Sequence, residues 1–452
     1  MTGLRRTGKT TVMEQAISEL AEDAFNDTVF LQAYDTRRYD ILDILDVMDT
    51  LYEEGKRIFF LDEVTFAENF PAGCMRIADD FARGGCRVCV TGTHSLSIWL
   101  AKNMYMQGRY EEVKTTVIPF AEWSRLLFPG ELPDSDEYLR RGGVLDLYGI
   151  STRTALACAS SPDDISTRAG ASFYIHSAVA LNIQNSIAKH KRGELFGDLQ
   201  ALYDEGALTD AIARIVQHQG HQATLSVLNG AFASDDAYAI RLGTCRTALS
   251  KSLSGLWQEV EKRIAREIGI DNERRRITAR EAKAIIEWLK DIDFFEDAPD
   301  VVLSIDGSSY SSPRTILAQP ALRTEQMLQA AGTFLTFLRE EGLEYDERRI
   351  EKLIENAVFG HMQEDVVLSE LKRSLPGTQI FGLKLKDGNR QIAEYDVAVA
   401  APNGVALLEI KHSDTYRTNH SEYTAGRNKV ANSLAAKSLC PNRIHLEESL
   451  FF

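Results

Sequence analysis

The sequence is poor in cysteine and has no long apolar run, and each shortage excludes a class of protein. Its six cysteines among 452 residues are too few and too irregularly spaced for a disulfide framework, so we expect reduced thiols. No window holds about 18 uninterrupted apolar residues, and no apolar stretch follows the first arginines, so neither a membrane span nor a signal peptide is supported. We therefore expect a cytoplasmic protein without membrane contact.

Basic residues are outnumbered by acidic ones, and metal-ligand patterns are scarce. With 51 Lys+Arg against 66 Asp+Glu, the formal net charge of -15 repels a polyanion and argues against a protein that coats nucleic acid. Cys86 and Cys89 form one C-x-x-C pair with no second pair at zinc spacing, so we do not expect zinc. The composition that remains, with 44% hydrophobic and 26% charged residues, is typical of a globular protein. Its length predicts about two to four domains.

Residues 3 to 10 match a phosphate-binding loop. They read G-L-R-R-T-G-K-T and fit the G-x-x-x-x-G-K-[ST] pattern at every fixed position. Glycines in this pattern let backbone N–H groups face phosphate, and the following helix points its positive end at the same place. Apolar residues at helical spacing from Val12 to Leu20 predict that helix. The residues that we expect around ATP are Gly3, Arg5, Arg6, Thr7, Gly8, Lys9, Thr10 and Thr11.

Four of the polar side chains have defined chemistry in such a site. Lys9 is expected to place a positive charge on the β and γ phosphates, and the Thr10 hydroxyl to ligate Mg²⁺. The second half of the site should be a buried strand that ends in acid, and residues 57 to 63 have this pattern. Asp62 is expected to hold the Mg²⁺ shell, and Glu63 to polarise the attacking water. The alternative for two acids after a strand is a solvated turn.

Thr93 and Arg109 are further candidates. Thr93 follows a third strand over residues 87 to 92, where a hydroxyl can sense the γ-phosphate, although hydroxyls at strand ends often only cap the next helix. Arg109 follows Gly108 and is expected to stabilise charge, the alternative being a solvated arginine. Only Met1 and Thr2 precede Gly3, whereas a phosphate loop needs a strand in front of it to aim it. We expect this first strand to lie upstream of Met1, the alternative being that another segment fills its place.

These motifs resemble a family of prokaryotic AAA-type ATPases that join a phosphate-loop domain to a C-terminal nuclease-like domain. The resemblance implies ATP and Mg²⁺ as ligands and an upstream start of the first strand. It extends over nearly the whole chain. The segments that carry it are residues 3–10, 60–63, 91–93, 108–109, 118–123, 138–143, 208–212 and 362–367.

The middle of the chain is predicted to be helical, with a winged-helix-like domain after it. Residues 178 to 187 and 207 to 217 have helical periodicity, and Thr278-x-x-Glu281 is a capping box that opens another helix. Strand patterns from Val301 onward flank a turn at residues 306 to 309 and predict a β-hairpin. Helices followed by one hairpin suggest a winged helix, in which Arg274, Arg275, Arg276 and Arg280 would touch DNA phosphates. The alternative for these arginines is a solvated basic face.

The C-terminal part has the pattern of a PD-(D/E)xK nuclease core. Residues 392 to 399 alternate as a strand, residues 402 to 404 turn, and residues 405 to 411 return. Period-two geometry places Glu409 and Lys411 on one face, where Asp396 can approach them. Two carboxylates on one cation beside a lysine form a common phosphodiester-cleaving site, and Glu364 on the preceding helix is a fourth candidate. An ordinary hairpin with exposed charges is the alternative.

The fold class that we expect is therefore α/β. The expected domains are a P-loop NTPase domain of the AAA type without its first strand (1–128), a helical region (129–245), a winged-helix-like domain (246–340) and a restriction-endonuclease-like domain (345–452). The expected activity is Mg²⁺-dependent ATP hydrolysis coupled to a DNA-related C-terminal domain. A nucleotide-dependent switch without fast hydrolysis and an ATP-regulated nuclease are the alternatives. The sequence leaves the oligomeric state open.

Overall fold

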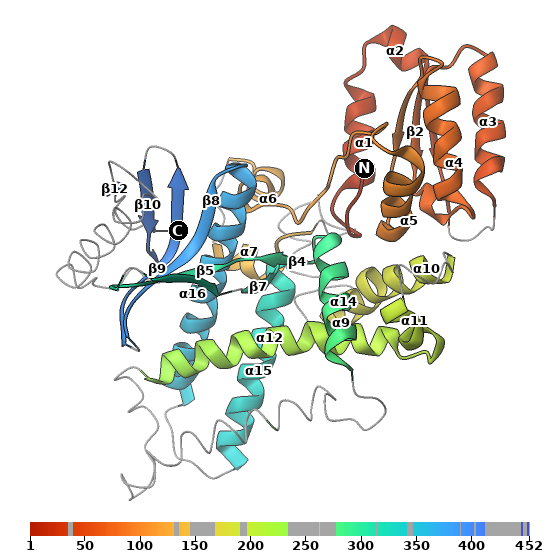
Figure 1. Cartoon of the computed structure of the whole chain (residues 1–452). Coiled ribbons are helices and arrows are strands. Elements are labelled where there is room, and N and C mark those ends of the chain that lie inside the picture. The colour runs from red at the N-terminus through yellow and green to blue at the C-terminus, as the bar shows by residue number, and fades with distance from the viewer. Residues whose placement is uncertain are drawn as a thin grey trace, which may run out of the picture.

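The computed structural model describes most of the chain. The described residues are 1–34, 39–130, 135–144, 168–189, 197–233, 262, 277–306, 308–312, 314–340, 347–388, 390–401, 404–411, 444–445 and 450–451. Figure 1 shows the N-terminal α/β unit, helices below it and a second sheet near the C-terminal end of the chain.

The N-terminal unit is built on a parallel sheet in the order β1-β2-β3. The central strand β2 carries four apolar residues in a row, and Phe59 and Leu61 are fully buried in a core shared with the helices that cover one face. Figure 1 shows α1 on one side of this sheet and α3 and α4 on the other. The elements are α1(Lys9–Ser18), α2(Glu22–Asn26), β1(Thr28–Gln32), α3(Ile41–Glu53), β2(Ile58–Asp62), η1(Val64–Phe66), α4(Phe70–Arg76), η2(Ile77–Ala82), β3(Arg87–Val90), α5(Ser95–Leu100) and η3(Ala101–Met106).

Helices dominate the described residues between about 120 and 291. The apolar faces of the helices between residues 168 and 291 form one core that also takes in Leu4 of the phosphate loop and Leu100 of α5, so these helices pack directly against the N-terminal unit. The buried apolar residues of the helices between residues 120 and 141 belong to a second core with apolar residues between 327 and 362. The expected capping box is present, because the Thr278 side chain accepts from the Glu281 backbone and the Glu281 side chain accepts from the Thr278 backbone. The helices are α6(Phe120–Leu127), α7(Ser135–Arg141), α9(Arg168–Tyr174), η4(Ile175–Ala180), α10(Leu181–Lys189), α11(Gly197–Asp204), α12(Leu208–Ala233) and α14(Ala279–Asp291).

In the part of the chain that the structure describes, the second sheet has six strands in the order β12-β10-β9-β8-β5-β6. The predicted hairpin is present as antiparallel β5 and β6, but β5 also pairs in parallel with β8. This sheet therefore contains residues on both sides of the boundary that we expected between residues 340 and 345. The winged-helix-like domain stays a prediction. The strands of the sheet are β5(Asp300–Ser304), β6(Ser309–Ser312), β8(Gln379–Asp387), β9(Arg390–Ala401), β10(Gly404–Leu408) and β12(Ile444–His445).

Two long helices connect the helical core to this sheet. They are α15(Pro320–Glu340) and α16(Glu347–Ser374), and Leu368 of α16 is buried against Val397, Leu408 and Ile410. The described residues also form two small sheets, made by β4(Phe295–Asp297) with β7(Thr315–Leu317) and by β11(Ile410–Lys411) with β13(Leu450–Phe451). Among the helices that the structure describes, none is long and apolar enough to cross a bilayer.

Candidate functional site

The lysine of the phosphate loop donates to carbonyls of the same loop. Gly8 lies at φ 81°, a conformation that glycine adopts without strain, and α1 begins at the next residue. Lys9 is 6% exposed, and its Nζ donates to the carbonyls of Gly3 at 3.0 Å and Leu4 at 2.9 Å. Burial lowers the pKa of Lys9, whereas the negative charges of Glu63 and Asp62 oppose this shift. The lysine is thus held at the start of α1, where phosphate oxygens can take the place of the two carbonyls.

Asp62 is the fully buried polar centre of the site. Its Oδ2 accepts from the Thr10 hydroxyl at 2.9 Å and from Gln32 Nε2 at 3.2 Å, and its Oδ1 accepts from the Thr91 hydroxyl. The carboxylate therefore links the helix after the loop to the ends of β1, β2 and β3. The two expected Mg²⁺ ligands, Thr10 and Asp62, lie in direct contact.

Glu63 has a strained backbone and a fixed carboxylate. Its φ of 54° is left-handed, which is uncommon for a residue other than glycine and is typical of functional sites. The carboxylate accepts from Thr93 N at 2.9 Å and from the Thr93 hydroxyl at 2.6 Å, and Glu63 N donates to the Thr91 hydroxyl at 3.1 Å. The expected water-polarising acid and the expected phosphate sensor therefore form one pair.

Met1 and Thr2 lie where the first strand of the sheet is expected. Thr2 pairs in parallel with both Gly92 and Lys114, Thr2 N donates to Val113 O at 2.9 Å, and Thr115 N donates to Thr2 O at 2.7 Å. A cavity of about 320 Å³ lies beside them, lined by residues of β3 and by Val113. Our expectation that the remainder of this strand lies upstream stays a prediction.

Arg109 contacts residues outside the phosphate loop. Its guanidinium donates to the Asp79 carboxylate of η2 and to the carbonyls of Tyr105 and Met106. These contacts do not support a charge-stabilising role at the phosphate loop, which stays a prediction.

Sequence reasoning missed three residues that shape the site. Gln32 and Thr91 bind the Asp62 carboxylate, and Thr115 shares a contact of 2.7 Å with the Thr7 hydroxyl of the loop. Gln32 and Thr91 each lie at or just after the end of a strand, which was a usable signal because the ends of parallel strands meet at one edge. Thr115 carried no such signal, since it is more than 100 residues from Thr7 in sequence.

With this geometry in place, known proteins offer one comparison. Residues 1–124 match a family model described as an AAA domain. This match supports a P-loop NTPase fold and nucleotide binding for the N-terminal part. No curated protein and no solved structure matches the chain.

Beyond residue 124, the structure describes the surroundings of Asp396 and Glu364, two residues of the expected nuclease site, which stays a prediction. Asp396 Oδ2 accepts from Ile410 N at 2.6 Å, so Asp396 lies beside the segment that carries Glu409 and Lys411. Glu364 on α16 instead pairs with His361, with its Oε2 3.3 Å from Nδ1. Among the described residues no group of three or more His, Cys, Asp and Glu side chains is close enough to hold a metal. Arg274, Arg275 and Arg276 lie outside the described residues.

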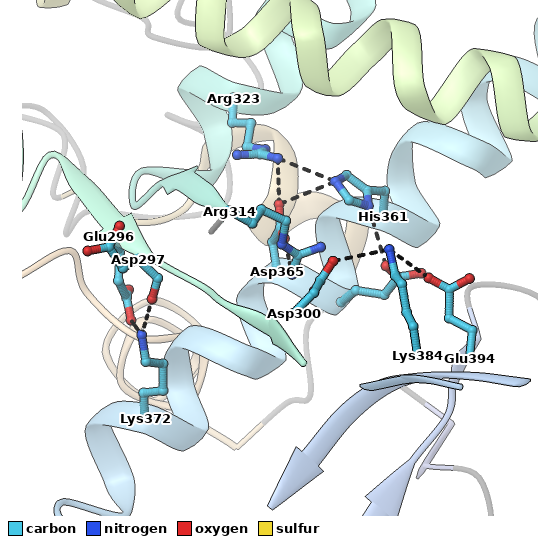
Figure 2. A network of polar contacts seen from close by, with 11 residues as sticks. Glu296, Asp297, Asp300, Arg314, Arg323, His361, Asp365, Lys372, Lys384 and Glu394 are labelled. Carbon is cyan, nitrogen blue, oxygen red and sulfur yellow. Dashed lines mark hydrogen bonds and ion pairs between the residues drawn. The ribbon is translucent and has the colours of Figure 1, made fainter. Parts of the chain in front are cut away.

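Figure 2 shows a network of charged side chains around Asp365 and Lys384, of which Asp365 and Arg323 are buried. Asp365 lies 2.7 Å from Arg323 of α15 and 3.2 Å from Arg314, which follows β6. Lys384 of β8 lies 3.1 Å from both Asp300 and Glu394. Each cation thus has an acidic partner within the protein, so the network ties α15 and α16 to the sheet.

Proposed function

We propose that the AAA domain binds ATP and hydrolyses it with Mg²⁺, and that the C-terminal sheet responds to its nucleotide state. The observation that carries this proposal is the direct contact between Thr10 and Asp62 at 2.9 Å, beside the buried Lys9. A hydroxyl and a carboxylate are ligands that suit Mg²⁺, and here they come from the two motifs that a P-loop NTPase requires.

Each residue has a role that its contacts support. Lys9 exchanges its two carbonyl partners for phosphate oxygens and neutralises the charge that develops on them. Mg²⁺, held by Thr10 and Asp62, would supply further charge neutralisation to the phosphates. Glu63 accepts a proton from the attacking water, and Thr93 fixes its carboxylate until the water is in place.

The C-terminal part suggests a second function, a metal-dependent nuclease that ATP regulates. The observation that favours it is the contact of Asp396 with Ile410, because it brings the acid of β9 to the Glu409-x-Lys411 segment. The antiparallel strands β8, β9 and β10, with α16 packed against them, support this second function. DNA is the expected partner of this part.

The first test is ATP binding by calorimetry. Lys9→Ala should weaken binding by tenfold or more, because loss of one charge-assisted contact to phosphate costs about 1.5–3 kcal/mol. Lys352→Ala, an exposed lysine of α16, is the matched control and should bind as the wild type does. Unchanged affinity in Lys9→Ala would refute the proposed site.

The alternatives differ in turnover. A hydrolysing enzyme releases phosphate, and DNA changes the rate of this release. A switch binds ATP as tightly as the enzyme does but releases almost no phosphate. Metal-dependent nicking of plasmid DNA that Asp396→Ala abolishes would identify the nuclease. Absence of nicking with normal ATP turnover would leave the ATPase alone.

A further inference from the structure

A cavity of about 200 Å³ is lined by residues of α6, of α7 and of the C-terminal half of α16. Phe120, Leu139, Val366 and Leu371 give it mainly apolar walls. Phe120 is also the first residue of α6, near the end of the segment that matches the AAA domain. The cavity therefore adjoins the junction between the nucleotide-binding part and the long helix that reaches the C-terminal sheet.

Glu370 is the acid in this wall. One carboxylate oxygen, Oε1, accepts from Phe120 N at the start of α6. Among the residues that the structure describes, Glu370 forms no ion pair, because the nearby Arg373 is directed to Glu296 and to the carbonyl of Val117. Burial raises the pKa of Glu370, against the hydrogen bond from Phe120 and the charge of Arg373.

A half-buried carboxylate without a counter-ion is costly unless a cation joins it. The free lone pairs of Glu370 can accept from an ammonium group, while the apolar wall of the cavity can cover an aromatic ring. An empty apolar cavity of about 150 Å³ is known to hold benzene, so a single ring with a short arm fits about 200 Å³.

We propose that this cavity binds a compact aromatic amine, with its ring against Phe120, Leu139 and Leu371 and its ammonium on Glu370. Such a ligand contacts the carboxylate that holds the start of α6 to α16. Its binding is independent of ATP chemistry and therefore does not rest on the proposed function.

Benzylamine, which is an ammonium ion at pH 7, is the probe. Ligand-observed NMR and thermal unfolding should detect its binding to the full chain with a Kd on the order of 1 mM or below. Glu370→Gln should raise this Kd at least tenfold, and it keeps an acceptor for Phe120 N so that the fold survives. Benzyl alcohol, of the same size without the charge, should bind the wild type at least tenfold more weakly than benzylamine does.

A second variant tests whether benzylamine binds in the cavity, whereas Glu370→Gln tests the role of the carboxylate charge. Val366→Phe fills the cavity and should abolish binding while the far-ultraviolet circular dichroism stays unchanged. Equal benzylamine affinity in wild type and Glu370→Gln would overturn the proposal, as would no binding at about 10 mM, where a ligand of millimolar Kd is mostly bound.

Discussion

At the scale of single residues, Thr91 determines how the two acids of the proposed ATP site are held. Its hydroxyl donates to Asp62 and accepts from the backbone N–H of Glu63. One hydroxyl has one donor and two acceptor lone pairs, so the Thr91 hydroxyl can form both hydrogen bonds at the same time. The buried side chain of Thr91 thus fixes Asp62, which is the expected metal ligand, and the turn that carries Glu63.

Glu63 allows binding to be separated from chemistry. Glu63→Gln should keep ATP affinity, because an amide oxygen still accepts from Thr93 and no charge on Lys9 or Asp62 is removed. Turnover should fall by about a hundredfold or more, since the amide cannot take a proton from water. Steady-state phosphate release and calorimetric ATP binding measure the two effects.

The control for this variant is Glu53→Gln, an exposed acid at the end of α3. It should leave both ATP affinity and phosphate release at the wild-type level. If Glu63→Gln hydrolyses ATP as fast as the control does, Glu63 is not the general base.

At the scale of elements, α16 joins three parts of the molecule. Near its middle, Asp365 lies between Arg323 of α15 and Arg314 of the β6–β7 connection. Near its C-terminal end, Glu370 and Arg373 bind the backbone of residues 117 and 120. These polar contacts therefore set how α16 is placed against α15, against the β6–β7 connection and against residues 117–120.

The buried pair of Asp365 and Arg323 should dominate this arrangement. Asp365→Asn should lower the free energy of unfolding at pH 7 by about 3–5 kcal/mol, because it leaves Arg323 buried without its counter-ion. Urea unfolding measures the loss. Glu351→Gln, an exposed acid on the same helix, should change it by less than about 0.5 kcal/mol.

The loss should also depend on pH. Burial alone would raise the pKa of Asp365, but the charges of Arg323, His361 and Arg314 hold it below its usual value. A depressed pKa adds stability above the unfolded value of about 4, and this stability disappears as the pH falls through the folded value. The difference between wild type and Asp365→Asn should therefore shrink below about pH 4. A difference that grows with acid would contradict the pairing.

At the scale of the whole molecule, the second sheet unites segments that are distant in sequence. Leu303 of β5 is fully buried in one core with Leu383, Tyr395 and Leu407 of the C-terminal strands. A fragment that begins near residue 345 would lack β5 and expose this core. Tests of the C-terminal site therefore need the full chain.

The metal hypothesis for Asp396 can be tested in that form. Without nucleotide, Mn²⁺ should raise the thermal unfolding temperature, by a stabilisation of about 2.7 kcal/mol at a hundredfold excess over Kd. Asp396→Asn keeps the acceptor for Ile410 N and should lose the part of the shift that the C-terminal site contributes. Asp62→Asn, at the other expected metal site, should retain that part.

Asp387→Asn is the surface control, because Asp387 is exposed at the end of β8 in the same sheet. It should respond to Mn²⁺ as the wild type does. Equal shifts in wild type and Asp396→Asn would favour the alternative of an ordinary β-hairpin with exposed charges.

The sequence by itself determined the local features. The spacing from Gly3 to Thr10, the apolar run before Asp62 and the capping box at Thr278 each predicted an element that the structure contains. These patterns are readable because glycine conformation, strand burial and helix capping depend on neighbours within a few residues.

Only the tertiary structure decided which distant residues meet. Some contacts join residues that are 29 to 250 positions apart or that lie on separate strands. They are the hydrogen bonds of Thr91 with Asp62, of Thr115 with Thr7 and of Glu370 with Phe120, and the pairing of β5 with β8. A polar side chain at a strand or helix end has many partners within reach, and local sequence does not rank them. Packing of the apolar faces selects one arrangement, and the polar contacts then form between whichever groups that packing brings together.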